Sequence, residues 1–360
     1  MSFNYSGNIK ISVFGQSHSE AIGVVIDNLP CGYDIDEQKL QAFCDRRRSL
    51  DNLSTPRKEA DKVKIVSGLF NGKTCGSPVM AIIENTDVRS KDYEKLVSHP
   101  RPSHADFTSK IKYGGYGDYR GGGHFSGRMT APLCIAGGII KQILEENGIT
   151  VGAHLYSIKD VYDIPFDMVN VSEKDFVTGF PCRDEEKAEK MKEIILSAKA
   201  QGDSVGGIIE CAVLGVEAGY GSPMFDGVEN VISSLMFAVP AVKGIEFGNG
   251  FSASTLYGSE NNDNIINEKG KTETNNSGGI NGGITNGNPI VFRVALKPTP
   301  SIHKVQQTYN FAENKVDGLI VGGRHDPCVA VRAVPVIESM AMIATLDIIL
   351  KEKTLNKKKA

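Results

Sequence analysis

The stretch IKISVFGQSHSEAIGVVI (9–26) places a polar loop between two short apolar segments. In residues 9–13 apolar and polar side chains alternate, which is the pattern of a half-buried strand. The apolar segment 22–26 follows closely, so we expect it to pair with the first strand as an antiparallel hairpin. The loop GQSH (15–18) therefore presents His18 at a strand end. This histidine is either an ordinary turn residue or a group held in place to move a proton.

The rest of the chain continues this mixture of strands and helices. Hydrophobic periodicity and capping residues predict helices at 34–48, 128–148, 184–202, 225–238 and 330–353. Alternating or apolar runs predict strands at 63–70, 79–85, 207–216 and 290–297. The Asn/Gly-rich segment 258–289 is expected to be a mobile loop, and 351–360 a short basic tail. No linker divides the chain convincingly, so we expect one α+β domain over residues 1–360 with antiparallel hairpins.

Composition narrows the class of protein. The 360 residues carry a formal charge of -3, with 40% hydrophobic and 23% charged residues, which is typical of a globular protein and gives no support for bulk nucleic-acid binding. The start lacks a signal-peptide pattern, and we expect no stretch to be long and apolar enough to span a membrane. The seven cysteines are scattered, which favours free thiols in a reducing, cytoplasmic compartment over disulfides or a zinc ribbon.

Four loop segments concentrate arginine, histidine and glycine: GQSH (15–18), RPSHAD (101–106), GDYRGGGHFSGR (117–128) and GGRHDPC (322–328). Arginines interleaved with glycines suit a pocket for a polyanion, because the guanidinium group makes two-point contacts with phosphate or carboxylate. The glycine-rich stretch offers backbone N–H groups to an anion but matches neither a P-loop nor a dinucleotide fingerprint. A solvated basic surface is the alternative for the run Arg46–Arg48.

The histidines of these loops have competing interpretations. Each could be a structural, hydrogen-bonded residue, or a proton-transfer group near neutral pH. His104 with Asp106, and His325 with Asp326, could also bind a metal, but no standard metal spacing is present and the nearby arginines would oppose a cation. Asp326 could be a turn residue before proline or a general base. Together the patterns predict an enzyme with histidine acid–base chemistry acting on a phosphorylated or multiply anionic small molecule.

Over nearly its whole length the chain resembles the chorismate synthase family. The segments that carry the resemblance occur in the family's order: FGQSH, DRRR, NTDVRSKDY, RPSHADFTSKIKYG, DYRGGG, GDSVGG, VKGIEFGNGF, NSGGINGGITNG, ALKPTPSI and GGRHDPCVAVRAVPVIE. The resemblance implies a β-α-β sandwich with helices between antiparallel sheets, and a homotetramer. It also implies a lyase that converts 5-enolpyruvylshikimate 3-phosphate to chorismate by anti-1,4-elimination of phosphate. The reaction would depend on reduced FMN, with NADPH as an indirect reductant or a separate flavin reductase as partner.

The resemblance also assigns roles to individual residues. His18 would protonate the departing phosphate with Ser17 in a proton relay, His104 would protonate or stabilise the reduced flavin, and Asp326 would assist proton removal from carbon 6. The positions that would bind the substrate's anions are Arg47, Arg48, Arg128 and Arg324. The positions that would contact FMN are Arg47, His124, Phe125, Ser126, Pro240, Ala241, Gly282, Lys297, Pro298, Thr299, Pro300, Ser301 and Arg324. No metal is implied.

A few positions depart from the commoner family pattern, and these are Gln16, Ser19, Leu53, His124 and Pro240. Leu53 falls where many members have an arginine linked to NADPH or anion binding. The altered segment around His124 motivates an alternative function, a flavin-binding carrier or regulator without lyase activity. A metallohydrolase that uses His18, His104 and Asp326 is a further hypothesis.

Overall fold

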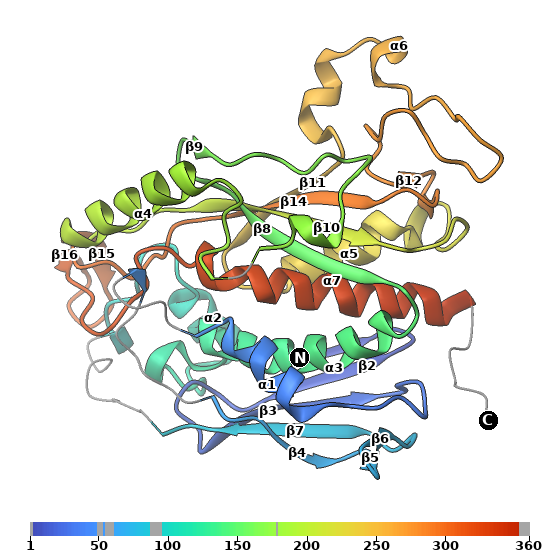
Figure 1. Cartoon of the computed structure of the whole chain (residues 1–360). Helices are drawn as coiled ribbons and strands as arrows, with labels where there is room; N and C mark the ends of the chain where they lie inside the picture. Colours follow the sequence, from blue (N-terminus) through green and yellow to red (C-terminus); the bar gives the residue numbers. More distant parts are fainter. Residues whose placement is uncertain (1–2, 49–52, 55–60, 87–95, 178, 353–360) are drawn as a thin grey trace.

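A computed structural model describes residues 3–48, 53–54, 61–86, 96–177 and 179–352. Two five-stranded antiparallel sheets face each other across a layer of helices (Figure 1). The first sheet has the order β1-β2-β3-β7-β4 and the second the order β11-β14-β10-β8-β9. The predicted β-α-β sandwich, with helices between antiparallel sheets, is therefore confirmed.

The first sheet contains the hairpin from which the sequence analysis began. Its strands are β1 Asn4–Ser6, β2 Lys10–Phe14, β3 Ala21–Asp27, β7 Val79–Glu84 and β4 Lys64–Ser67. Strands β2 and β3 pair antiparallel in the register Lys10–Asp27 to Phe14–Gly23, as predicted. The hairpin loop therefore lies at the end of two inner strands of the sheet, where a functional side chain can be fixed in place.

The second sheet lies on the other side of the helices. Its strands are β8 Thr150–Ile158, β9 Val161–Tyr162, β10 Gly207–Leu214, β11 Val242–Phe247 and β14 Ile290–Leu296. The small two-stranded sheets are β5 Leu69–Phe70 with β6 Lys73–Thr74, β12 Ile280–Asn281 with β13 Ile284–Thr285, and β15 Gln306–Asn310 with β16 Lys315–Leu319.

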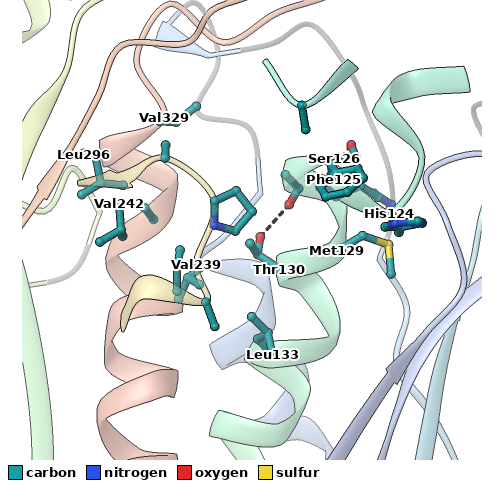
Figure 2. Close-up of a pocket in the computed structure, with 18 of the residues that line it drawn as sticks. His124, Phe125, Ser126, Met129, Thr130, Leu133, Val239, Val242, Leu296 and Val329 are labelled. Atoms are coloured by element: carbon teal, nitrogen blue, oxygen red, sulfur yellow. Dashed lines mark hydrogen bonds between the residues drawn. The ribbon is translucent and has the colours of Figure 1, made fainter. Parts of the chain in front are cut away.

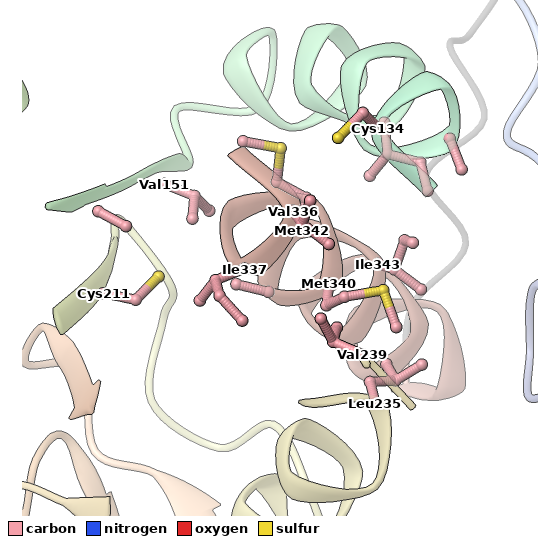
Figure 3. Packing of buried hydrophobic residues seen from close by; sticks show 14 of the residues in the cluster. Cys134, Val151, Cys211, Leu235, Val239, Val336, Ile337, Met340, Met342 and Ile343 are labelled. Carbon is pink, nitrogen blue, oxygen red and sulfur yellow. The ribbon is translucent and has the colours of Figure 1, made fainter. Parts of the chain in front are cut away.

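Four helices fill the space between the sheets: α1 Glu37–Asp45, α3 Thr130–Glu145, α5 Val228–Phe237 and α7 Ala330–Glu352. Helix α7 packs against α3, α5, β8 and β10, so it contacts both the helix layer and the second sheet. Figure 3 shows Ile337, Met340 and Ile343 of α7 among side chains from neighbouring elements. Full burial of one such side chain contributes about 1.5–3 kcal/mol, so α7 is a main source of stability.

Helix α7 corrects one expectation about membranes. Residues Ala330–Glu352 are long and apolar enough to cross a membrane by length and composition, although the sequence analysis expected no such stretch. In the structure 94% of its apolar window is buried inside the protein. Its hydrophobicity is therefore explained by its central position, since a core helix is apolar on all sides.

Other boundaries also differ from expectation. Strand 63–70 breaks at Gly68, whose positive φ of 93° turns the chain, so Leu69–Phe70 pair with β6 instead. Helix α1 begins after its N-cap Asp36 as expected but ends at Asp45. Arg46, Arg47 and Arg48, which the predicted helix 34–48 would include, therefore follow the last turn of α1.

The remaining helices lie outside the central layer. They are α2 Asp106–Lys112, α4 Glu185–Ala200, α6 Gly258–Asn261, η3 Arg120–Phe125, η4 Gly127–Met129, η5 Glu173–Asp175, η6 Met224–Asp226 and η7 Gly250–Thr255. Helix α4 buries the four residues that its periodicity predicts, Ala188, Met191, Ile195 and Ala198. The segment 258–289 projects from the sandwich and contains α6, β12 and β13 (Figure 1), while its mobility stays a prediction. Most of the basic tail lies outside the described residues.

Candidate active site

A cavity of about 860 Å³ opens where the loops at one end of the sandwich meet the first turns of α3 and α7. Figure 2 shows its wall: Phe125, Met129 and Leu133 on one side face Val239, Val242 and Leu296 on the other. This volume lies within the range of small-molecule and cofactor sites. The apolar wall suits a flat ring system, whereas the mouth of the cavity is lined by charged loops.

Two buried arginines from different elements meet beside the start of α3. The Arg47 guanidinium donates to the Thr130 hydroxyl and the Gly127 carbonyl, both at 2.8 Å. Arg128 forms an ion pair with Asp61 at 2.5 Å, and Arg47 reaches the same carboxylate at 3.4 Å. Burial, and then the nearby charge of Arg332, lowers the pKa of Arg47 to about 10. One carboxylate between two guanidinium groups leaves this wall positively charged, as an anion site requires.

Asp326 is held by an arginine that the sequence analysis did not single out. The Arg332 guanidinium donates to Asp326 Oδ2 at 2.7 Å and to the Arg47 carbonyl at 2.9 Å. Both Asp326 and Arg332 line the cavity. Arg332 lies in the first turn of α7 and joins the loop of Asp326 to the loop of Arg47.

The loop RPSHAD forms a compact charged cluster. Asp106 accepts from Arg101 Nε and NH2, each at 2.7 Å, and contacts His104 Nδ1 at 2.7 Å. Arg101 NH1 also donates to the Ser301 hydroxyl at 3.1 Å. Burial is the largest influence on His104 and lowers its pKa; the bond to Asp106 opposes this, and the charge of Arg101 supports it. His104 is therefore neutral over most of the physiological pH range.

The glycine-rich loop lies between the two predicted catalytic histidines. A Cβ atom on Gly121 would stand 2.5 Å from Ser17 Oγ and 2.7 Å from His18 Nε2. A Cβ atom on the next residue, Gly122, would stand 3.5 Å from His104 Nε2. Gly121 also has a φ of 61°, so both its conformation and its surroundings require glycine. The loop thus brings His18 and His104 to two consecutive backbone positions at the cavity's edge.

Two further basic residues of the cavity have perturbed pKa values. Burial lowers the pKa of His325 to about 4, although its Nε2 atom lies 2.8 Å from the Gly322 carbonyl. Burial also lowers the pKa of Lys297, and the charge of Lys243 adds to this. The Lys297 ammonium donates to the Ser103 carbonyl at 2.6 Å, which links the end of β14 to the RPSHAD loop. A neutral His325 offers hydrogen bonds to a ligand without adding charge.

The structure brings most of the predicted site residues to this cavity. Those that line it are Arg47, His104, His124, Phe125, Ser126, Arg128, Pro240, Ala241, Lys297, Thr299, Pro300, Ser301, Arg324 and Asp326. Ser17 and His18 are buried behind Gly121, next to this lining. Pro298 is not part of the lining, although both its chain neighbours are.

Two predicted residues lie elsewhere. Arg48 pairs with Asp45 at 2.9 Å and leaves 40% of its side chain exposed, outside the lining. Gly282 occupies the turn between β12 and β13 in the projecting segment. Their binding roles stay predictions.

The sequence analysis missed Arg332, Asp61 and Thr130, and it gave Arg101 no role of its own. Asp61 carries no local motif, so only the fold could place it between two arginines. Arg332 lies within GGRHDPCVAVRAVPVIE and had a sequence signal, since it is a charge in an otherwise apolar helix. In the part of the chain that the structure describes, no group of three or more His, Cys, Asp or Glu side chains is placed to hold a metal ion. The metallohydrolase hypothesis therefore lacks a ready set of ligands there.

Comparisons with known proteins agree with this geometry. Residues 9–350 match the family described as chorismate synthase. The chain is 45% identical to a chorismate synthase of Chitinophaga pinensis, with 97% of this chain and 96% of the relative covered. It is 43% identical to one of Thermococcus kodakarensis, with 96% and 97% covered. A crystal structure of chorismate synthase superimposes with a TM-score of 0.74 at 26% identity, covering 96% of this chain and 92% of that one.

The family match spans the segments that form both sheets, the central helices and the charged loops around the cavity. The similarity in sequence and in structure is therefore not confined to one domain or motif. The chain belongs to the chorismate synthase family of carbon–oxygen lyases.

Proposed function

We propose that this protein catalyses the anti-1,4-elimination of phosphate from 5-enolpyruvylshikimate 3-phosphate, giving chorismate, and that the reaction depends on reduced FMN. The family implies a small-molecule substrate and a flavin. The observation that carries the finer proposal is the cavity itself, where Arg47, Arg128 and Arg332 converge beside Asp326. A substrate with one phosphate and two carboxylates needs such a lining, because anions are not removed from water without cationic partners.

The residues present also fit a flavin. Apolar side chains form one wall, and Lys297 and Arg324 also line the cavity and would supply the positive charge that a phosphate needs. Two buried polar atoms of lining residues, His124 Nε2 and Thr299 Oγ1, have no hydrogen-bond partner among the described residues. Buried polar atoms normally have partners, so a bound ligand would supply them. When bound, reduced FMN would lend an electron transiently and assist proton removal.

The chain's own residues would divide the remaining work. Phosphate leaves readily only when its charge is neutralised. The proposed acid is His18, and Ser17 would belong to the same proton relay. Both side chains lie behind Gly121. Asp326, held by Arg332, would assist the removal of the proton from carbon 6. Arg47 and Arg128 would hold the substrate's anionic groups and fix its orientation.

Anaerobic incubation tests the proposal directly. Purified protein with FMN, dithionite and the enolpyruvyl substrate should form chorismate and phosphate in equal amounts. Folded protein that binds FMN without forming either product would contradict it and favour the flavin-binding carrier or regulator instead. Repeating the assay in air with NADPH, with and without a flavin reductase, would identify the source of electrons. Sedimentation would test the proposed homotetramer.

A further inference from the structure

The cluster of Arg101, His104 and Asp106 contains a carboxylate that contacts two basic side chains at once. Asp106 Oδ1 lies 2.7 Å from both Arg101 NH2 and His104 Nδ1, while Oδ2 accepts from Arg101 Nε at 2.7 Å. Oδ2 also accepts from the Arg101 backbone N–H at 2.9 Å. The three side chains are 4%, 16% and 12% exposed, in the order Arg101, His104 and Asp106. The cluster is therefore nearly removed from solvent and has one defined arrangement.

The shortest contact of His104, between Nδ1 and Asp106 Oδ1 at 2.7 Å, decides which ring nitrogen carries the proton. An ionised carboxylate can only accept hydrogen bonds, and a guanidinium can only donate them. Burial would raise the pKa of Asp106, but the bonds from Arg101 and His104 outweigh it and hold the pKa well below its usual value. With Asp106 ionised, the atom that faces it must be a donor, so His104 Nδ1 carries the proton.

Because His104 lines the cavity, the position of its proton decides which ring nitrogen can accept a hydrogen bond there. With Nδ1 protonated, Nε2 of the neutral ring is the acceptor, and this edge of the ring lies beside Gly122, whose neighbour Gly121 lines the cavity together with His104. The other charged groups near the ring are Arg101 on the same loop and Lys297 from the end of β14. Without Asp106, Arg101 NH2, which lies 3.0 Å from Nδ1, would make that atom the acceptor and leave the proton on Nε2.

We propose that Asp106 is a positioning residue that fixes the tautomer of His104, so that Nε2 is the atom through which His104 exchanges a proton in the cavity. The same logic applies where a buried aspartate orients a catalytic histidine in hydrolase triads. The role of His104 in turnover rests on the proposed function, whereas its tautomer does not. The two parts can therefore be tested separately.

The isosteric variant Asp106→Asn is the main test, because it keeps the shape of the side chain and removes its charge. In ¹⁵N-histidine-labelled wild-type protein at neutral pH, His104 should show a protonated Nδ1 and an unprotonated Nε2, and Asp106→Asn should reverse this. The His104 signals are identified by their loss in His104→Gln. Asp106→Glu should restore the wild-type tautomer, because it supplies a carboxylate again.

Turnover provides the second readout. Asp106→Asn should lower kcat by roughly 10- to 100-fold, less than loss of the acid–base group itself, and Asp106→Glu should recover part of this. Asp317→Asn is the matched control, since Asp317 contacts His99 Nε2 at 3.3 Å and neither residue lines the cavity. It should change neither kcat nor the His104 signals.

The outcomes separate the two hypotheses. An unchanged His104 tautomer in folded Asp106→Asn overturns the positioning role, whether or not the protein turns over substrate. A reversed tautomer with unchanged kcat also overturns it, because the tautomer would then not matter to the reaction. If wild-type protein shows the expected tautomer but forms no chorismate, the proposed function fails while the geometry of the cluster stands.

Discussion

Two histidines of this protein, the half-buried His104 and the fully buried His154, have carboxylate partners, yet their surroundings shift their pKa values in opposite directions. His104 has one carboxylate partner, Asp106, which it shares with Arg101. His154 is fully buried on β8 and has two partners, Asp163 at 2.8 Å and Glu210 at 3.0 Å. Burial lowers both pKa values, and only the two carboxylates around His154 outweigh it and raise the pKa.

Under the proposed function, His104 takes part in the reaction, whereas His154 contributes to stability. The Asp163 carboxylate also accepts from the backbone N–H groups of Ile164, Arg183 and Asp184, and thereby fastens the segment 163–184 to the second sheet. Because each ring nitrogen of His154 contacts a carboxylate oxygen, which can only accept, both nitrogens must donate and the buried ring is the charged link between Asp163 and Glu210. His104 is neutral, lines the cavity and keeps one nitrogen available to a ligand.

The largest effect should come from His104. We expect His104→Gln to lower turnover by roughly 10²–10⁴-fold, the usual contribution of an acid–base group. Its free energy of unfolding should change by less than about 1 kcal/mol, because Asp106 keeps its bonds to Arg101. Steady-state kinetics and denaturant unfolding measure the two quantities. Near-normal turnover would contradict the role of His104.

The complementary variant, His154→Gln, should affect stability first. Removing the imidazolium leaves Asp163 and Glu210 buried without their shared cation, which costs about 3–5 kcal/mol of unfolding free energy. Urea unfolding followed by circular dichroism measures this loss. His303→Gln, at an exposed position, is the control and should be close to neutral. A loss similar to the control would mean that His154 is not the link described.

The pH dependence of unfolding should differ in sign at the two sites. The raised pKa of His154 gives stability that is complete below about pH 6.5, its ordinary value, and is lost as pH rises through the folded-state pKa. The lowered pKa of His104 acts in reverse, so its site loses stability as pH falls below about 6.5. Subtracting the unfolding curves of His154→Gln and His104→Gln from that of wild type should give slopes of opposite sign. Slopes of the same sign would contradict the comparison.

The smallest expected effect concerns the two arginines. Arg101→Met should move the titration of His104 to higher pH, because the guanidinium charge lowers its pKa. Arg293 bonds Glu210 at 2.8 Å but acts on His154 only through that carboxylate, so Arg293→Met should move the His154 titration less. Histidine NMR titrations of both variants measure these shifts. A larger movement at His154 would contradict the assigned causes.

The comparison also shows what could be predicted from the sequence. The β2–β3 hairpin, the buried face of α4 and the helix at 330–352 follow from periodicity, because side chains that share a face repeat along the chain. Whether α7 is a core helix or a membrane span does not follow, since both are apolar on all sides.

The site was predictable only in part, because local sequence patterns do not show which distant segments come into contact. Segments rich in Arg, His and Gly mark the loops around the cavity, and the family resemblance supplies roles for single residues. The ion pairs between acidic and basic side chains depend on contacts between segments that are distant in the sequence, such as Asp61 with Arg128. His154, a lone histidine within an apolar strand, gives no sign in the sequence that Glu210 and Asp163 surround it.

The measurement that tests the central claim most directly is anaerobic chorismate formation by wild type and His104→Gln. Both proteins are assayed without denaturant near pH 7, at the same concentrations of FMN and dithionite. The account predicts steady product formation by wild type and a rate at least about 10²-fold lower in the folded variant. Equal rates in the two proteins, or no chorismate from folded, FMN-bound wild type, would contradict it.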